Sequence, residues 1–360
     1  MKNLGLVEAE RLELIPEKYW KSHEFCFYLL SQIVSSSESL EETGSHLAVS
    51  DAVVAAAERL RVDPEELDWI ELLRNDEMMD LYHHHIVGHL VLALISDMVQ
   101  FLDEALRALE KRKFTVAYSL LRKPLKENLL YLVWLLADEA DFVRRFERES
   151  FSHLQIGKIT SDEKGEIFQA AIGKLPLEDA FDPILIRDAI YDKSSAHGLE
   201  WFFQKATHLV TSQGASLRTD DYELNFIFND PDEDAHFDPL YDETNLLPYI
   251  LLFAAQVCIE LLSRIGDAHE KTIEYLRLVT MGTWQALFLP GRPSITQSLT
   301  RSFGDLLRCL HCDSTLRVTK RSAPLFFLHE TIECSSCGLL NGVPLYWIFC
   351  AAGREADQQD

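Results

Sequence analysis

Several features that mark common protein classes are missing from this chain of 360 residues. Its first twenty residues, MKNLGLVEAERLELIPEKYW, lack the apolar core of a secretion signal. The sequence also has no phosphate-binding glycine loop, no GxSxG nucleophile elbow and no HExxH pair. These absences argue against the familiar signatures of nucleotide hydrolases, α/β-hydrolases and zinc proteases. The missing secretion signal predicts a soluble protein of the cytoplasm.

Basic residues are scarce, with 34 Lys and Arg against 58 Asp and Glu, and the formal net charge is -24. A field of this sign repels nucleic acid at long range. Any contact with RNA or DNA therefore requires a local basic pocket. The acidity also fits a basic partner protein, or solubility alone.

The most apolar stretch, residues 246–262, reads LLPYILLFAAQVCIELL and contains Gln256, Glu260 and an early proline. A membrane span of this length is expected to carry fewer polar groups. The stretch therefore predicts a buried core helix, and no contact with a membrane is expected.

Helical periodicity dominates the sequence. Residues 78–113 place apolar side chains at i, i+3, i+4 and i+7, and a second long helix is predicted over 115–146. Because few residues join the two helices, they are expected to form an antiparallel hairpin at the centre of a mainly α multi-helix bundle. Ser161 and Asp182 are predicted N-caps. Other predicted elements are helices over 17–35, 63–75, 162–175, 182–192, 195–211, 247–265 and 268–287, and a short strand over 222–228.

Four cysteines near the C-terminus form two CxxC pairs that are separated by 21 residues: Cys309, Cys312, Cys334 and Cys337. In a reducing compartment such pairs bind metal more often than they form disulfides. Four thiolates complete the tetrahedral shell of zinc and leave no open position for a substrate, so the predicted cofactor is one structural Zn²⁺ per chain. Cys26 and Cys258 lie in apolar runs and are expected in the core.

The cysteine segment, residues 305–353, resembles the zinc-ribbon family. The insert between the pairs predicts two strands joined by a turn at 321–324, and the sequence GVPLYWIF predicts a third strand. Residues 290–304, which include PGRPS, are interpreted as a linker after a helical domain of residues 1–289. Three cations near the predicted turn either contact a phosphate backbone or are simply solvated: Arg317, Lys320 and Arg321.

A polar cluster interrupts the otherwise core-like second long helix beside Pro124, which is expected to kink it. The cluster consists of Arg122, Lys123, Lys126, Glu127 and Asn128. Buried polar groups lower stability unless they are paired, and they are often retained at functional sites. The alternative is an ordinary Lys123–Glu127 pair with a solvated Arg122.

Histidines provide further candidates. His197, which precedes Gly198 at a predicted helix start, either faces a cavity or caps the helix. His85 and His89 lie four residues apart on one helical face, a spacing that can chelate a metal, next to His83 and His84. A second metal site and packed histidines are both open interpretations.

Residues 78–211 resemble HEPN-like helical domains, on the strength of the segment ALRALEKRKFTVAYSLLRKPLKENLLYL and the later SSAHG. The resemblance implies an all-helical, often dimeric protein of the kind found in bacterial toxin–antitoxin and phage-defence systems. Active members are metal-independent ribonucleases that use an arginine and a histidine. Arg122 matches that arginine. Asn128 stands where the family has its histidine, so His197 is the candidate substitute as general base.

Two functions follow from these patterns. The first is a HEPN-like bacterial effector or RNA-processing protein, in which Arg122, Glu127 and His197 form the catalytic pocket and RNA binds there or at the ribbon. The second is a non-enzymatic scaffold, in which the ribbon and the acidic residues of 219–243 bind a partner protein. A cleft that holds Arg122 and His197 together favours catalysis, whereas an Arg122 paired only with Glu127 favours the scaffold.

Overall fold

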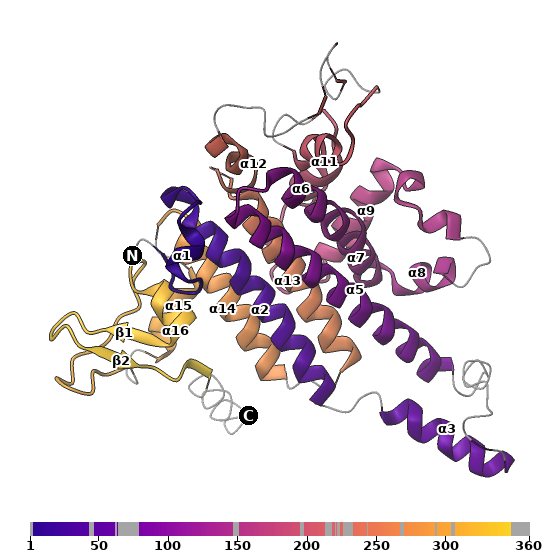
Figure 1. The fold of residues 1–360 in the computed structure, drawn as a ribbon. Coiled ribbons are helices and arrows are strands. Elements are labelled where there is room, and N and C mark those ends of the chain that lie inside the picture. The colour runs from indigo at the N-terminus through magenta and orange to yellow at the C-terminus, as the bar shows by residue number, and fades with distance from the viewer. Residues whose placement is uncertain are drawn as a thin grey trace.

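A computed structural model describes most of the chain, and it is mainly helical with one small antiparallel sheet near the four cysteines (Figure 1). The predicted fold class is confirmed. The described residues are 3–42, 47–61, 63, 79–146, 151–194, 198–212, 218–219, 221, 224–225, 233–242, 244–266, 270–291, 294–303 and 307–346. The predicted helix over 63–75 and strand over 222–228 lie almost entirely outside them.

The elements follow one another in a simple order along the chain. The α-helices are α1 (Ala9–Leu12), α2 (Trp20–Glu42), α3 (Leu47–Leu60), α5 (Met79–Glu110), α6 (Phe114–Lys123), α7 (Leu129–Ala137), α8 (Glu139–Phe146), α9 (Ser161–Ile172), α10 (Pro183–Tyr191), α11 (Leu199–Thr207), α12 (Asp238–Tyr241), α13 (Leu246–Ile265), α14 (Glu270–Phe288), α15 (Ser294–Phe303) and α16 (Ala323–His329). The shorter helical turns are η1 (Glu17–Tyr19), η4 (Pro124–Asn128), η5 (Phe151–Leu154), η6 (Ile156–Lys158), η7 (Glu178–Ala180) and η9 (Glu233–Phe237), and the strands are β1 (Thr331–Glu333) and β2 (Leu340–Gly342).

Helix α13 is the centre of the core, and it packs against α2, α5, α7 and α14. It is buried on nearly all sides, and its one central amide, Gln256, donates to the Thr280 hydroxyl at 2.8 Å. By length and composition, residues 81–110 and 234–265 are each apolar enough to span a membrane, but 83% of the apolar 18-residue window in the second stretch is buried inside the protein. The apolar run is therefore a core helix, as predicted.

Helices α5 and α6 form the predicted hairpin and lie side by side (Figure 1). The turn between them contains Arg112 in a left-handed conformation, with φ 53°. The predicted second helix is wrong as one continuous element, because it consists of α6, the π-helical turn η4, α7 and α8.

Pro124 accounts for the first interruption. It has no N–H to donate, and the Leu129 N–H donates to the Pro124 carbonyl five residues back, which defines a π turn. Asp138 causes the second break, with φ −153° and ψ 84°. The kink expected at Pro124 is therefore a local widening of the helix.

The predicted caps have different outcomes. Asp182 caps α10 as expected, because its carboxylate accepts the N–H groups of Ile184 and Leu185. Ser161 does not cap α9. Thr160 does, with its hydroxyl accepting the Glu163 N–H at 3.1 Å.

The cysteine-rich segment contains a helix where a turn between strands was predicted. Residues 323–329 form α16, β1 pairs with β2 with Ile332 opposite Asn341, and residues 345–346 are helical. The predicted strand pair is therefore wrong except for β1 at its end. The predicted third strand overlaps β2 only at Gly342 and is helical at 345–346, and its residues 347–349 lie outside the described ones. Helix α15 lies within the predicted linker. The division into two domains stays a prediction.

The cysteine-rich segment packs directly on the bundle through α14 and α16 (Figure 1). A Cβ added to Gly282 of α14 would lie 2.4 Å from the Phe327 ring of α16, so only glycine permits this approach. The N-terminal segment adds a second tie. The buried Glu24 accepts the Leu4 N–H at 2.6 Å, and the His329 ring bonds the Leu4 carbonyl at 3.0 Å.

Candidate functional site

The four cysteines predicted as metal ligands converge at the sheet of the C-terminal segment, with all sulfur atoms within 4.8 Å of one another. The Cys309–Cys337 and Cys312–Cys334 sulfur distances are both 3.6 Å. A zinc ion with Zn–S bonds of about 2.3 Å requires tetrahedral edges of about 3.8 Å, whereas a disulfide requires about 2.05 Å. The thiols are free and spaced to hold one metal ion.

Both cysteine pairs use the same backbone turn. The Asp313 N–H donates to the Cys309 carbonyl at 3.0 Å, and the Gly338 N–H donates to the Cys334 carbonyl at 2.9 Å. The fifth residue of each turn is left-handed, with φ 55° at Asp313 and 74° at Gly338. A glycine or aspartate tolerates this conformation.

Backbone N–H groups close to the cysteines favour the thiolate form of their sulfur atoms. The His311 N–H lowers the pKa of Cys309 to about 6. The Cys337 N–H likewise lowers the pKa of Cys334. The Leu339 N–H also favours the Cys337 thiolate, but burial and the neighbouring thiols outweigh it and raise that pKa to about 12. Four thiolates this close repel one another, so a cation is needed to ionise all of them.

A polar cavity of about 580 Å³ lies beside the π turn, which makes it the second candidate site. It is walled by α6, η4, α7, the segment through η6, and the helices α9, α10 and α11. Its lining residues are Arg122, Lys126, Glu127, Tyr131, Gln155, Ile156, Gly157, Ile159, Ser161, Lys164, Tyr191, Lys193, Glu200 and Gln204.

The π turn explains why neighbouring polar residues share this cavity. An α-helix with 3.6 residues per turn would direct residues 126 and 127 about 100° apart, and residue 127 well away from 122. The wider turn at η4 brings Arg122, Lys126 and Glu127 to the same wall. Single-turn π segments of this kind are frequent at functional sites.

Arg122 lines the cavity but is poorly satisfied. Its Nη1 lies 3.7 Å from a Glu127 carboxylate oxygen, an ion pair too long for a good hydrogen bond, and the two side chains are 35% and 41% exposed. The Arg122 Nε is buried and has no hydrogen-bond partner among the described residues. This pairing with Glu127 is the arrangement expected of a scaffold, whereas the position in a cavity is the one expected of a binding site.

Lys126 and Glu200 form the deepest ion pair of the cavity. The Lys126 ammonium donates to one oxygen of Glu200, and Gln204 donates to the other at 2.9 Å. Their side chains are 9% and 2% exposed. Burial lowers the pKa of Lys126, although the hydrogen bond to Glu200 opposes this shift.

Lys164 is the second buried cation, and no carboxylate pairs with it among the described residues. Its ammonium donates to the carbonyls of Ile159 and, at 3.1 Å, Ile156. It lies 5.3 Å from the centre of the Tyr191 ring, and Lys126 lies 5.7 Å from the same centre. Burial, followed by the charge of Lys126, lowers the pKa of Lys164.

The other predicted members of the polar cluster lie elsewhere. Lys123 pairs with Asp97 at 2.7 Å, not with Glu127, and the Asn128 amide donates to the same carboxylate at 2.7 Å. The hypothesis of a Lys123–Glu127 pair is therefore wrong. Lys164 and Glu200 were not predicted, because each lies in a different helix and neither stands out locally in the sequence.

The structure describes the predicted His85–His89 pair but not His197. His197 lies outside the described residues, although Lys193 and Glu200 on either side of it line the cavity. Within the described ranges, the four cysteines are the one group of three or more potential metal ligands, so no third ligand joins His85 and His89 there. Burial lowers the pKa of His85, and the neighbouring His89 and His84 add to the shift.

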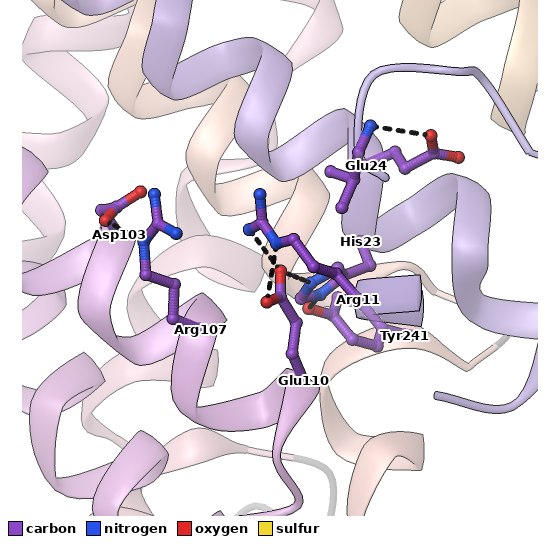
Figure 2. A network of polar contacts seen from close by, with 8 residues as sticks. Arg11, His23, Glu24, Asp103, Arg107, Glu110 and Tyr241 are labelled. Atoms are coloured by element: carbon purple, nitrogen blue, oxygen red, sulfur yellow. Dashed lines mark hydrogen bonds and ion pairs between the residues drawn. The ribbon is translucent and has the colours of Figure 1, made fainter. Parts of the chain in front are cut away.

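A second buried polar cluster joins α1, α2, α5 and α12, and the sequence did not reveal it (Figure 2). Glu110 accepts hydrogen bonds from Arg11 Nη2 at 2.6 Å and Nε at 3.0 Å, and from His23 Nε2 at 3.3 Å. The other ring nitrogen of His23 bonds the Tyr241 hydroxyl at 2.8 Å. Each of these contacts joins residues far apart in sequence, which local patterns cannot show.

Comparison of the chain with protein-family models, curated proteins and solved structures gives no match. The structure by itself shows a mainly helical protein with a four-cysteine site able to hold a metal ion.

Proposed function

We propose that this protein is a HEPN-like RNA-processing protein of the bacterial cytoplasm, that it binds RNA in the polar cavity, and that its four cysteines hold a structural zinc ion. The observation that carries the proposal is the convergence of four cations on one cavity, namely Arg122, Lys126, Lys164 and Lys193.

The charge of the cavity runs against the charge of the chain. Four cations and two carboxylates line it, which gives a formal charge of +2 in a protein of net charge -24. A low-dielectric cleft concentrates a field of one sign and raises the local concentration of ligands of the other sign. The cavity is the local basic pocket that an acidic protein needs in order to bind a phosphate group.

In the catalytic form of the proposal, Arg122 stabilises the charge on the attacked phosphate, with the Glu127 carboxylate 3.7 Å from its guanidinium. His197 is the proposed general base, and the choice is supported by Lys193 and Glu200, which line the cavity and lie before and after it in the sequence. The reaction is metal-independent, and the zinc ion takes no part in it. A homodimer is the proposed assembly.

The test uses total RNA and short labelled RNA oligomers with purified wild type, Arg122→Ala and His197→Ala. We expect both variants to lose cleavage and Arg122→Ala to weaken binding at least tenfold. Arg107→Ala is the matched control, because Arg107 is an exposed arginine on α5 that pairs with Asp103 and lies outside the cavity. Equal cleavage by all four proteins, or no binding by any, would overturn the proposal.

The zinc assignment has its own test. Elemental analysis is expected to give about one zinc per chain, and Cys334→Ser is expected to lose it. Because α16 and the sheet share a buried cluster with α14, loss of the metal is expected to expose Phe326 and Phe327 to solvent. Proteolysis between residues 303 and 346 that is equal in both proteins would contradict a structural metal.

A scaffold function is the second candidate, and three exposed leucines around the metal site favour it. Leu310, Leu339 and Leu340 are 84%, 46% and 63% exposed. Apolar side chains on the surface of a small metal-bound segment favour a partner protein. If cleavage is absent and a triple Leu→Ser variant loses a bound partner while Arg122→Ala keeps it, the scaffold is the better description.

A further inference from the structure

The geometry of the polar cavity points to Lys164 as the general acid of the proposed cleavage, meaning the group that gives a proton to the oxygen atom that leaves the phosphorus. This inference rests on the proposed cleavage of RNA in the cavity. It adds a catalytic residue from α9, which the sequence did not single out.

Cleavage of RNA without a metal ion involves two proton transfers. The 2′-hydroxyl oxygen forms a bond to the neighbouring phosphorus, and its proton passes to the general base, proposed as His197. The bond between phosphorus and the 5′-oxygen breaks, and this oxygen takes a proton from the general acid, because an alkoxide is a poor leaving group. The products are a 2′,3′-cyclic phosphate and a 5′-hydroxyl, so the step needs no oxidant and no further reactant.

The hydrogen bonds of Lys164 leave one of its protons available. An ammonium has three N–H groups, and the carbonyls of Ile159 and, at 3.1 Å, Ile156 accept two of them. Among the described residues, no other hydrogen-bond acceptor contacts this ammonium. After loss of the third proton, the neutral amine keeps two N–H groups for the same two carbonyls. The site therefore suits the lysine both before and after the proton is given away.

The surroundings of Lys164 favour release of that proton. The residue is 6% exposed, and burial lowers its pKa. The charge of Lys126 lowers the pKa further, although Glu163 opposes the shift. A general acid is most effective when its pKa lies near the working pH. Lys193 lines the same cavity but is exposed, so it lacks this desolvation.

The other donors of the cavity are less suited to the role. Lys126 donates to the buried carboxylate of Glu200, which stabilises its charged form. The hydroxyls of Tyr131 and Tyr191 donate to backbone carbonyls at 2.6 and 2.8 Å, and burial raises the pKa of both. Arg122 remains protonated in proteins, so it stabilises charge without giving a proton.

Arg122 and Lys164 are neighbours along the cavity wall, with Lys126 close to both. The charge of Arg122 lowers the pKa of Lys126, and the charge of Lys126 lowers that of Lys164. The Arg122 side chain is 35% exposed, whereas Lys164 lies almost entirely out of solvent. In the proposed complex the phosphate lies between the two residues, with its leaving oxygen toward the inner lysine.

The experiment uses an RNA oligomer that the wild type cleaves and a second oligomer of the same sequence, in which sulfur replaces the 5′-oxygen at the cleaved link. A thiol is far more acidic than an alcohol, so the sulfur leaves as a thiolate without a proton. Removal of the general acid should therefore slow cleavage of the oxygen link and spare the sulfur link. Cleavage rates are measured with the full chain in single turnovers.

Lys164→Met is expected to slow cleavage of the oxygen link by about 100-fold or more, the lower end of the contribution of a general acid, and cleavage of the sulfur link by less than about threefold. Lys164→Arg is expected to show the same selective loss, because it keeps a cation that does not give up its proton. Arg122→Ala should slow both links, since charge develops on the phosphate whichever atom leaves.

Lys174→Met is the matched control, because Lys174 is an exposed lysine just after the same helix. It should cleave both links at the wild-type rate. Rapid cleavage of the sulfur link by Lys164→Met would also show that this variant is folded. A loss confined to the oxygen link therefore cannot come from unfolding.

The outcomes separate this inference from the proposed function. Cleavage of the oxygen link by Lys164→Met at the wild-type rate would overturn the assignment of the general acid and keep the proposed cleavage. An equal loss on both links in both Lys164 variants would do the same, because it would show a structural role for the lysine. Absence of RNA cleavage by the wild type would overturn the proposed cleavage and the inference together.

Discussion

The protein contains two buried polar clusters, and they differ in how completely their groups are paired. Around Glu110, the carboxylate has a bidentate arginine and a histidine, and that histidine has a tyrosine hydroxyl (Figure 2). In the cavity, Arg122 Nε and one N–H of Lys164 have no acceptor among the described residues. A fully paired cluster is built for stability, and a partly paired one for a ligand.

The two clusters also differ in how closely their side chains are packed. The Glu110 cluster is closely packed, with His23 completely buried and Tyr241 2% exposed. The cavity keeps about 580 Å³ between its walls. The two clusters should therefore respond differently to mutation: one should lose stability, and the other should lose binding.

Glu110→Ala is expected to have the largest effect. It leaves Arg11 and His23 without their acceptor in a buried site, which costs about 3–5 kcal/mol of unfolding free energy. Urea unfolding measures the change. Glu104→Ala, an exposed glutamate on the same helix, should change the unfolding free energy by less than about 0.5 kcal/mol. Similar values for the two variants would remove the distinction between the clusters.

Lys126→Met is expected to come second. The Lys126–Glu200 pair is the one well-paired part of the cavity, and removing the lysine leaves a carboxylate that is 2% exposed without its cation. Gln204 still donates to Glu200, so the expected loss is about 2–3 kcal/mol. The double variant Lys126→Met with Glu200→Met should recover part of this loss in the same urea experiment, and a double variant as unstable as the single one would contradict the pairing argument.

The pH dependence of stability is expected to show a smaller effect from His23 of the Glu110 cluster. Burial lowers the pKa of His23 below its unfolded value of 6.5, although Glu110 opposes the shift. Below pH 6.5 this histidine is protonated in the unfolded chain but still neutral in the folded protein. Stability therefore falls as the pH falls, by up to about 1.4 kcal/mol per pH unit for one group. His23 is neutral above it, with Nε2–H donating to Glu110 and Nδ1 accepting from Tyr241.

Urea unfolding of the wild type and His23→Gln at pH 7.5 and 5.5 measures this effect. The wild type should lose more stability than the variant over this interval. Glu110 adds little there, because its pKa lies below 4.5: burial alone would raise it, but the bonds from His23 and Arg11 lower it. An equal loss in both proteins would show that His23 takes up its proton without unfolding.

Lys164→Met is expected to change stability least, by less than about 1 kcal/mol. The variant removes a buried charge that has no carboxylate partner, which is favourable, but it leaves two carbonyls without a donor, which is not. Unfolding free energy and RNA binding, measured on the same sample, test this directly. A loss of 3 kcal/mol or more would place Lys164 among the structural groups and weaken the case for a ligand.

Some of this architecture could be predicted because its causes are local. The four cysteines act within two short turns, and the left-handed residue that each turn needs is visible as Gly338 and Asp313. The core helix α13 is apolar over its own length. The predicted strands of the ribbon failed at α16 because aromatic residues favour strands in general, whereas here Phe326 and Phe327 lie on a short helix, buried in the cluster that it shares with α14.

The sequence by itself determined the class of the fold, the four cysteines that could hold a metal ion and the polar break at Pro124, since each depends on spacing along a few neighbouring residues. Only the tertiary structure decided which charges meet. Lys126, Lys164 and Glu200 come from three elements, and Arg11, His23 and Glu110 come from three others. The energy of a buried charge depends on partners distant in sequence, and folding alone brings those partners within hydrogen-bonding distance.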